Sequence, residues 1–312
     1  MEYEFSEAAD ISFFSRPENV LKHLARRLAE GRLSLVLGAG VSAGLGLPGW
    51  GELLDRCFNA LGQARPIGKS EQDVGDSLRS FVGGDRGRLA KVVQDSLYLR
   101  FTRSLRTMQE NRLLVALGAM IMSASRSNVV PIISFNYDDL LEVYLGYHGF
   151  VVIPVFELPA WASRADATVF HPHGFLSSAE GRTPAGSIII SQIDYDDGGD
   201  KWIPWKNLIF DRLSSTTPLF IGLSGKDQNL KALLAHLKEV HASRSTGEAY
   251  WGFRVALADD EFTDQWDIRG VGQHSLNSYD DLPAELLRIC QLAAEFRSHA
   301  MSLRLQLGGL PP

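Results

Sequence analysis

LSLVLGAGVSAGLGLPGW, residues 33–50, is the stretch of sequence that determines the fold. Its first five residues, Leu33–Leu37, form a short, largely apolar run that is typical of a buried strand in a parallel sheet. A glycine-rich turn follows at once. Gly38 and Gly40 permit backbone angles that other residues resist, and without side chains they let a phosphate approach the backbone N–H groups. The stretch therefore predicts a strand that ends in a nucleotide-binding turn; the alternative is a tight turn without a ligand.

Strand and helix patterns alternate along the rest of the chain. Buried strands are expected at residues 129–135, 150–155, 218–223 and 250–257, and a strand-like segment at 187–191. Helices are expected at residues 19–30, 139–144, 206–213 and 283–307. Residues 50–128 are expected to be mostly helical, with no second buried strand. This alternation predicts an α/β fold with a Rossmann-like, doubly wound, mainly parallel sheet and a helical insertion module.

Three segments are expected along the chain. Residues 1–32 form an N-terminal helical segment, and residues 33–257 form the nucleotide-binding domain, with 50–128 as its helical insertion. Residues 258–312 form a C-terminal segment that ends in a helix packed on the core.

Composition limits the classes of function. The chain has 312 residues, 45% hydrophobic and 22% charged, which is close to a globular average. A net charge of −6 argues against a basic nucleic-acid footprint, so direct nucleic-acid binding is not expected. The two cysteines, Cys57 and Cys290, form no CxxC pair, which excludes a disulfide framework and a four-cysteine zinc site and favours a cytoplasmic location. No apolar stretch is long enough to span a membrane, and residues 1–14 lack the pattern of a signal peptide, so neither is expected.

A second polar motif, SFNYDD at residues 134–139, follows the second expected strand. Side chains at the carboxyl end of such a strand point into the crevice where open α/β sheets bind ligands. Asn136 can hold a sugar hydroxyl or a water molecule, and Asp138 can fix a loop or a ribose. The alternative is that Asp138 or Asp139 caps the following helix, and Glu142 is expected to be structural.

The segment FHPHG, residues 170–174, places two histidines two residues apart. No further histidine or cysteine lies nearby in the sequence to complete a metal site, so no metal is expected. His173 suits the role of a general base, because a glycine beside it leaves space for a ligand and imidazole titrates near neutral pH. The alternative is a buried, hydrogen-bonded histidine. A last strand end, IGLSGKD at residues 221–227, offers Gly222 and Ser224 as a second contact to phosphate or ribose, or forms a plain turn.

These four strand-end motifs, in this order, resemble the sirtuin superfamily, and its bacterial SIR2-like branch more than its protein deacylases. GAGVSAGLGLP resembles the family loop GAGxSxxxGxP, and FNYD resembles the branch's T-N-Y-D element, with Phe135 in place of Thr. His173 and Gly174 resemble the family's catalytic HG, and IGLS resembles its G-T/Y-S strand end. The resemblance covers about residues 33–257.

The resemblance implies that NAD is the substrate and assigns roles to the motifs. The turn would line the NAD diphosphate through four residues: Gly38, Ala39, Gly40 and Ser42. Asn136 would orient the nicotinamide ribose or the attacking water, Asp138 would support that pocket, and His173 would act as general base. Gly222 and Ser224 would contact the adenosine side.

The chain departs from the deacylases in one respect. They carry a zinc module built from two CxxC pairs, which this chain cannot form, and the segment 50–128 is expected to be helical in its place. Water is then the natural nucleophile. The resemblance therefore implies an NAD hydrolase that releases nicotinamide and ADP-ribose and depletes NAD in antiphage defence. The alternatives are an NAD-dependent protein deacylase and a non-catalytic sensor of NAD or ADP-ribose; cyclisation of ADP-ribose and use of NADP also stay open.

Control of such an activity is also implied by the resemblance, because an unregulated NADase would kill its host. We expect a homo-oligomer, and a separately encoded activating subunit such as an ATPase or helicase is a further candidate.

Overall fold

The computed structural model describes residues 11–123, 131–160, 165–179, 188–190, 194, 199–225, 228–243 and 250–306. Its strands are β1 (Leu33–Leu37), β2 (Ile132–Ser134), β3 (Val152–Val155), β4 (Ala167–Phe170), β5 (Thr217–Ile221), β6 (Gly252–Leu257) and β7 (Val271–Leu276). They form a seven-stranded sheet in the order β3-β4-β2-β1-β5-β6-β7. The pairs β2–β4, β3–β4, β5–β6 and β6–β7 are all parallel. The predicted α/β fold with a mainly parallel sheet is confirmed.

The helices of the described residues flank these strands. They are α1 (Ile11–Phe14), α2 (Pro17–Ala29), α3 (Trp50–Ala60), α4 (Glu71–Phe81), α5 (Arg86–Leu97), α6 (Leu105–Glu110), α7 (Arg112–Ser123), α8 (Leu140–Tyr147), α10 (Gly199–Ser214), α11 (Gln228–Ser243), α12 (Thr263–Asp267) and α13 (Leu282–Gln306). No strand occurs in residues 38–123, all of which are described, so the connection from β1 to β2 is helical there, as expected.

Strand β1 is buried along its whole length. A strand covered on both faces needs a nearly continuous apolar sequence, which LSLVL supplies. Its one polar side chain, Ser34, is fully buried and forms a hydrogen bond of 2.8 Å with the Thr216 hydroxyl. That partner removes the cost of burying the Ser34 hydroxyl.

The chain divides into two compact units. The site unit comprises Val36–Leu114 and Ile132–Ile209, and the terminal unit comprises Met1–Leu35, Val115–Pro131 and Phe210–Pro312. The three segments expected from the sequence stay a prediction.

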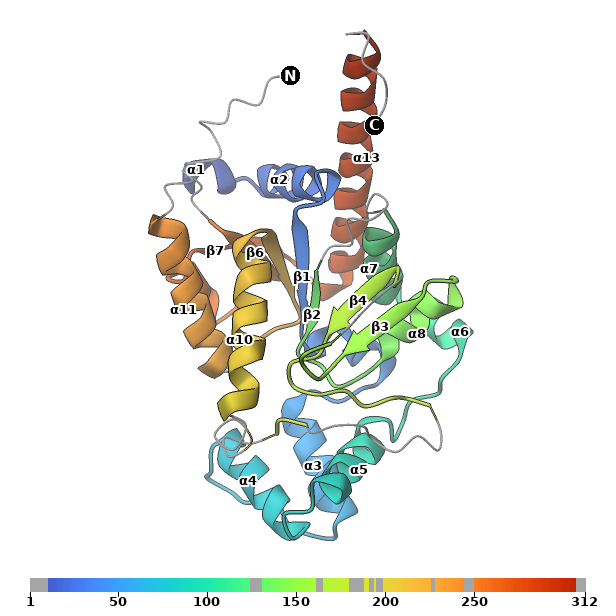
Figure 1. Cartoon of the computed structure of the whole chain (residues 1–312), viewed down its shortest axis with the longest axis vertical. Coiled ribbons are helices and arrows are strands. Elements are labelled where there is room, and N and C mark those ends of the chain that lie inside the picture. The colour runs from blue at the N-terminus through green and yellow to red at the C-terminus, as the bar shows by residue number, and fades with distance from the viewer. Residues whose placement is uncertain are drawn as a thin grey trace. The chain divides into compact units, whose positions relative to one another are not determined.

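In the site unit, helix α8 lies beside β3, and α3, α4 and α5 pack on one another (Figure 1). Helix α3 buries Leu53, Leu54, Cys57 and Phe58, whose spacing places them on one helical face. Helix α4 begins with a capping box at Ser70, which fixes where this helix starts.

In the terminal unit, helices α2 and α13 pack side by side (Figure 1). Pro17 occupies the first turn of α2, where its missing N–H is not needed. Near the other end of α2, the Arg297 guanidinium of α13 donates to the carbonyl of Leu28 (3.1 Å) and to that of Ala29 (3.5 Å). Arg297 thereby adds a donor to the Leu28 carbonyl, which also accepts from the Gly31 N–H (3.2 Å), and supplies one to the Ala29 carbonyl at the end of the helix.

Strands β4 and β7 and helices α11 and α12 were not expected from the sequence. Strand β7 lies at the edge of the sheet, and its polar residues Gln273 and Ser275 alternate with buried ones, so it lacks the nearly continuous apolar run of β1. Helix α11 does bury leucines at helical spacing, among them Leu230, Leu233 and Leu237, so its signal was present and was missed. The expected strand at 187–191 is described only at residues 188–190, which are not a strand, and Lys226 and Asp227 lie outside the described residues.

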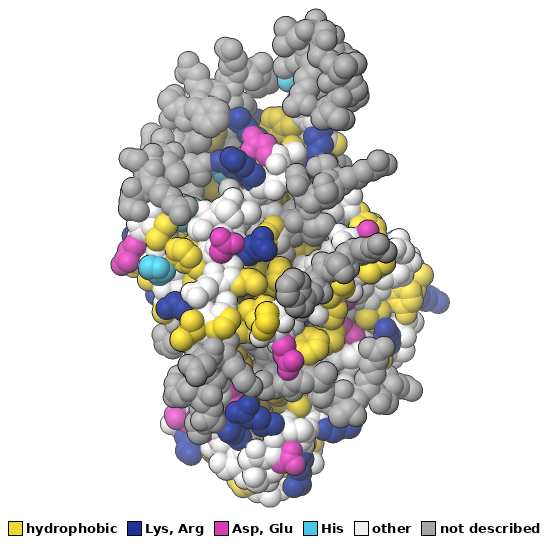
Figure 2. Space-filling view, viewed as in Figure 1, with side chains coloured by type: hydrophobic (Ala, Val, Ile, Leu, Met, Phe, Trp, Pro, Cys, Tyr) yellow, Lys and Arg dark blue, Asp and Glu magenta, His cyan; other side chains and the backbone are white. Residues whose placement is uncertain are grey.

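The surface shows charges of both signs. Basic and acidic side chains of the described residues are interspersed on the face drawn in Figure 2. Within the described part of the chain, no helix is both long enough and apolar enough to cross a membrane.

A buried arginine joins three elements of the terminal unit. Arg254 of β6 is only 3% exposed, and its guanidinium donates to Gln273 of β7 (2.8 Å) and to Asp260 (3.0 Å). It also donates to Thr263 of α12 at 3.2 Å and lies 5.7 Å from the Trp266 ring. The buried guanidinium therefore has an ion-pair partner in Asp260, further hydrogen-bond acceptors and a cation–π contact with Trp266, which together offset the cost of burying its charge.

We predict that Arg254→Met lowers the free energy of unfolding by about 3 kcal/mol, because Asp260 and Gln273 lose their partner. Urea unfolding of the variant and the wild type measures the difference. The control is Arg288→Met on α13, whose side chain is 45% exposed and whose change should stay within about 0.5 kcal/mol. Equal effects of the two substitutions would contradict the prediction.

Candidate active site

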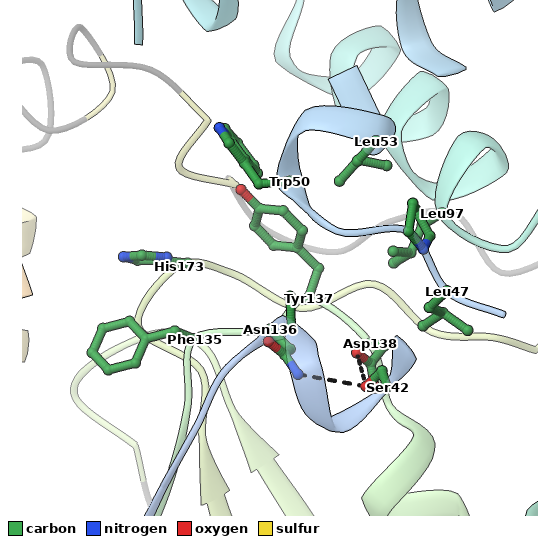
Figure 3. Close-up of a pocket in the computed structure, with 12 residues that line it drawn as sticks. Ser42, Leu47, Trp50, Leu53, Leu97, Phe135, Asn136, Tyr137, Asp138 and His173 are labelled. Atoms are coloured by element: carbon green, nitrogen blue, oxygen red, sulfur yellow. Dashed lines mark hydrogen bonds between the residues drawn. The ribbon is translucent and has the colours of Figure 1, made fainter. Parts of the chain in front are cut away.

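A cavity of about 80 Å³ lies in the site unit, where the segments that follow β1, β2 and β4 converge (Figure 3). It is lined by Ala39, Ser42, Leu47, Pro48, Trp50, Leu53, Leu97, Phe135, Asn136, Tyr137, Asp138 and His173. Asn136 and His173, the two predicted catalytic residues, therefore share one cavity. The carboxyl edge of a parallel sheet is where ligands of such folds bind.

The turn after β1 consists of two 3₁₀ turns, Ala39–Val41 and Ala43–Leu45, and α3 begins only at Trp50. Gly38 is extended, with φ −127°, and Gly40 is not among the glycines with positive φ; Gly46, with φ +82°, is the left-handed residue of this turn. The expectation that Gly38 and Gly40 are needed for unusual backbone angles is therefore wrong.

Glycine in this turn can also leave the backbone N–H groups accessible to a phosphate, and the structure is compatible with that role. Ala39 and Gly40 are exposed, whereas Gly38 is buried. The N–H groups of Ala39 and Gly40 donate to no backbone carbonyl of the described residues, as is usual for the first residues of a helical turn. Two such N–H groups side by side form a site that favours an anion.

Asn136 is held by its amide group. Its Nδ2 donates to the Gly38 carbonyl (3.0 Å) and reaches the Ser42 hydroxyl at 3.5 Å, and that hydroxyl donates to the Asp138 carboxylate (2.8 Å; Figure 3). These bonds join the turn after β1 to the segment after β2. Because Nδ2 is engaged, Oδ1 is the atom that the Asn136 side chain can offer to a ligand.

Asp138 supports this network and also caps a helix. One oxygen accepts from Ser42, and the other accepts from the backbone N–H of Leu140 at the start of α8 (3.2 Å). Both interpretations of the sequence are thus compatible with its contacts. The pKa of Asp138 is raised to about 6, mainly because burial disfavours its charged form, and the nearby Glu142 adds to the increase. The two hydrogen bonds that it accepts lower the pKa, but by less.

The Asp139 side chain forms no capping hydrogen bond with α8, and it has a role that the sequence did not indicate. Its carboxylate accepts from the Ser177 hydroxyl (2.9 Å) and from the backbone N–H of Ser178 (2.9 Å). The Tyr98 hydroxyl accepts from the Asp139 N–H (3.2 Å) and donates to the Leu176 carbonyl (2.7 Å). Burial, and next the charge of Asp139, raise the pKa of Tyr98 well above its ordinary value. Through these hydrogen bonds, Asp139 connects the loop after β4 to the segment that follows β2.

The two histidines of FHPHG differ in their surroundings. His173 lines the cavity, and its ring packs edge-on against Phe135 at a centroid distance of 4.9 Å. Gly174 follows with φ +104°, a backbone angle that favours glycine at this position. His171 is fully buried, and its ring forms hydrogen bonds with Glu142 and with the Asn136 carbonyl. The described residues contain no group of three or more side chains arranged to hold a metal ion.

An apolar wall completes the cavity and was missed in the sequence. Trp50, Leu53 and Leu97 come from the helical segment, and Tyr137 packs near Trp50 at a ring distance of 6.3 Å. No fixed spacing connects these residues, so the sequence carries no signal for them. An apolar, partly aromatic wall with an amide and an imidazole beside it suits an aromatic ring attached to a polar group.

Gly222 and Ser224 follow β5 in the terminal unit and are not among the described residues that line the cavity. Gly222 has φ +71°, which explains glycine at this strand end without a ligand. The predicted adenosine contact of both residues stays a prediction, as do the roles assigned to the turn residues, Asn136, Asp138 and His173.

We predict that Asp138→Asn changes how stability depends on pH. The folded-state pKa of about 6 lies above the ordinary 3.8, so the folded wild type binds a proton more tightly than the unfolded chain. Its stability should fall as the pH rises from about 4 to 6, by a total on the order of 3 kcal/mol, and stay lower above pH 6. The Asn variant should lack this decrease. Thermal unfolding of both proteins from pH 4 to 8 measures it, and parallel curves would contradict the raised pKa.

Comparison with known proteins agrees with these motifs. Residues 130–270 match the family model of the SIR2-like domain. Proteins named NAD(+) hydrolase ThsA from Bacillus cereus (strain MSX-D12) and Enterococcus faecium are 24% and 25% identical to the chain, over 72% and 80% of its length. The match covers 44% and 48% of those proteins, so the chain spans about half the length of these relatives.

A solved structure, described as a Sir2 homolog–NAD complex, aligns with 90% of this chain and 94% of its own. Its sequence identity is 14% and its TM-score 0.46, so the fold rests on the strand order and not on this superposition. The family match includes Asn136, Asp138 and His173 but begins after the glycine-rich turn. Residues 130–270 therefore match the SIR2-like domain, in agreement with the family resemblance found in the sequence motifs.

Proposed function

We propose that the chain is an NAD hydrolase, which converts NAD and water to nicotinamide, ADP-ribose and a proton. One observation carries the proposal: Asn136 and His173 come from separate strand ends and line the same cavity, beside the exposed turn at Ala39 and Gly40. The names of the ThsA relatives support NAD as the substrate.

Each part of the cavity has a task in this reaction. The apolar wall of Trp50 and Tyr137 takes the nicotinamide ring, and the N–H groups of the turn take the diphosphate. The Asn136 Oδ1 accepts a hydrogen bond from the ribose or from the attacking water. The bond between nicotinamide and ribose breaks with positive charge developing on the sugar, so positioning and electrostatics supply the catalysis. His173 accepts the proton that water loses as it bonds to the sugar carbon.

The biological role that we propose is NAD depletion in antiphage defence, gated by self-association or by a separately encoded subunit. This part rests on the family resemblance. Measuring cellular NAD and survival after phage infection, in cells with and without the chain, tests it directly.

We predict that Asn136→Ala and His173→Ala each lower nicotinamide release from NAD by about a hundredfold or more, because each removes a group that acts on the reacting ribose. Chromatographic quantification of nicotinamide, with and without an acylated peptide, measures the loss. Matched controls are Asn59→Ala and His148→Ala, which alter exposed residues away from the cavity and should keep the wild-type rate.

The assay also separates the alternatives. Release that occurs only with the acylated peptide would identify a deacylase instead. A wild type that binds NAD in calorimetry, yet releases no nicotinamide when purified and causes no NAD loss in phage-infected cells, would identify a sensor module. Release that persists in both cavity variants would overturn the assignment of the site.

A further inference from the structure

A buried pair of side chains, His171 and Glu142, lies behind the proposed catalytic residues. His171 follows β4 and is fully buried, and Glu142 of α8 is 9% exposed. The His171 Nε2 lies 2.6 Å from the Glu142 carboxylate, and its Nδ1 lies 2.9 Å from the Asn136 carbonyl. Neither side chain lines the proposed catalytic cavity, so neither touches a ligand bound there.

The partners of His171 determine where its protons lie. A carbonyl oxygen only accepts hydrogen bonds, so Nδ1 must carry a proton and donate it to Asn136. Nε2 faces a carboxylate, to which it donates as an imidazolium. Burial lowers the pKa of His171, but the charge of Glu142 and the hydrogen bonds to Glu142 and Asn136 raise it by more, so the net shift is upward.

The pair connects the two segments that carry the proposed catalytic residues. Asn136 is anchored at its side chain by the Gly38 carbonyl, at its N–H by the Ser134 hydroxyl (3.3 Å) and at its carbonyl by His171. His171 is itself fixed, because its N–H donates to the Val155 carbonyl (2.7 Å). Its own carbonyl accepts from Gly174, the residue after His173 (3.1 Å). One imidazole therefore links the Asn136 peptide to the backbone that presents His173.

We propose that His171, held by Glu142, is a positioning residue that keeps Asn136 and His173 in the geometry required for cleavage of the NAD glycosidic bond. The reaction in this inference is that of the proposed function, on which it rests. The positioning is argued from the described contacts alone. A displacement of about 1 Å in such a group can cost about a hundredfold in rate.

Two substitutions separate the two hydrogen bonds of the imidazole. An Asn at this position places its amide nitrogen near the Nδ1 position and can keep the bond to the Asn136 carbonyl. A Gln reaches toward the Nε2 position and keeps the contact at residue 142. Both are made together with Glu142→Gln, because an unpaired buried carboxylate would destabilise the fold for reasons unrelated to positioning.

We predict that His171→Gln with Glu142→Gln lowers the kcat of nicotinamide release by about tenfold to a hundredfold, with KM for NAD changed by less than about twofold. His171→Asn with Glu142→Gln should recover kcat to within about threefold of Glu142→Gln alone. Thermal unfolding shows whether the variants are equally folded. The positioning role would be overturned if the two double variants lost kcat equally, or if the effect of the substitutions appeared in KM instead of kcat.

A second measurement requires neither turnover nor a variant. Imidazole ¹⁵N shifts of the wild type should show a protonated, hydrogen-bonded Nδ1 at His171, and the Asn136 side-chain amide protons should exchange slowly with solvent. A His171 ring without a proton on Nδ1 would overturn the inference even if the enzyme is active. A wild type that shows these signals but releases no nicotinamide when purified and causes no NAD loss in phage-infected cells would instead contradict the proposed function and leave the positioning intact.

Discussion

The hydrogen bond from the Asn136 amide to the Gly38 carbonyl is the contact on which the proposed site depends. It joins two segments that are 98 residues apart in the sequence, the turn after β1 and the end of β2. The Ser42 hydroxyl and the Asp138 carboxylate extend the link, and the buried position of Asp138 makes any loss of these partners expensive. Because the amide nitrogen is occupied by the protein, the direction of the side-chain oxygen is fixed before a ligand arrives. Such preorganisation is what a site must have if it works by positioning.

Around this contact, buried polar groups connect the loops instead of binding the ligand. Asp139 holds the loop after β4 through Ser177 and Ser178, and His171 holds the Asn136 carbonyl. The surface of the cavity itself is mainly apolar, with Asn136 and His173 as partly buried polar side chains that line it. This separation of a rigid polar support from an apolar wall suits the cleavage of a bond between a flat aromatic ring and a sugar, where water must enter only at the sugar.

Much of the fold was predictable from the sequence because parallel strands covered on both faces need apolar runs that few other structures use. LSLVL and PLFI are such runs, and both are buried strands. Edge strand β7 was not predictable in this way, since its exposed face admits Gln273 and Ser275. The polar residues of the site were found because they stand directly after strands. The apolar wall was not found, because Trp50 and Leu97 are ordinary helix residues until the fold brings them together. The supporting roles of Asp139 and His171 depend likewise on contacts between distant segments.

The central claim is that this cavity holds the nicotinamide end of NAD. A crystal structure of the His173→Ala variant soaked with NAD tests it most directly, since the substitution slows cleavage without removing the apolar wall. The account predicts the nicotinamide ring against Trp50 and Tyr137, with the attached ribose within hydrogen-bonding distance of the Asn136 Oδ1. Density for NAD in which the nicotinamide lies outside this cavity, with the Asn136 side chain still bonded only to Gly38 and Ser42, would contradict it.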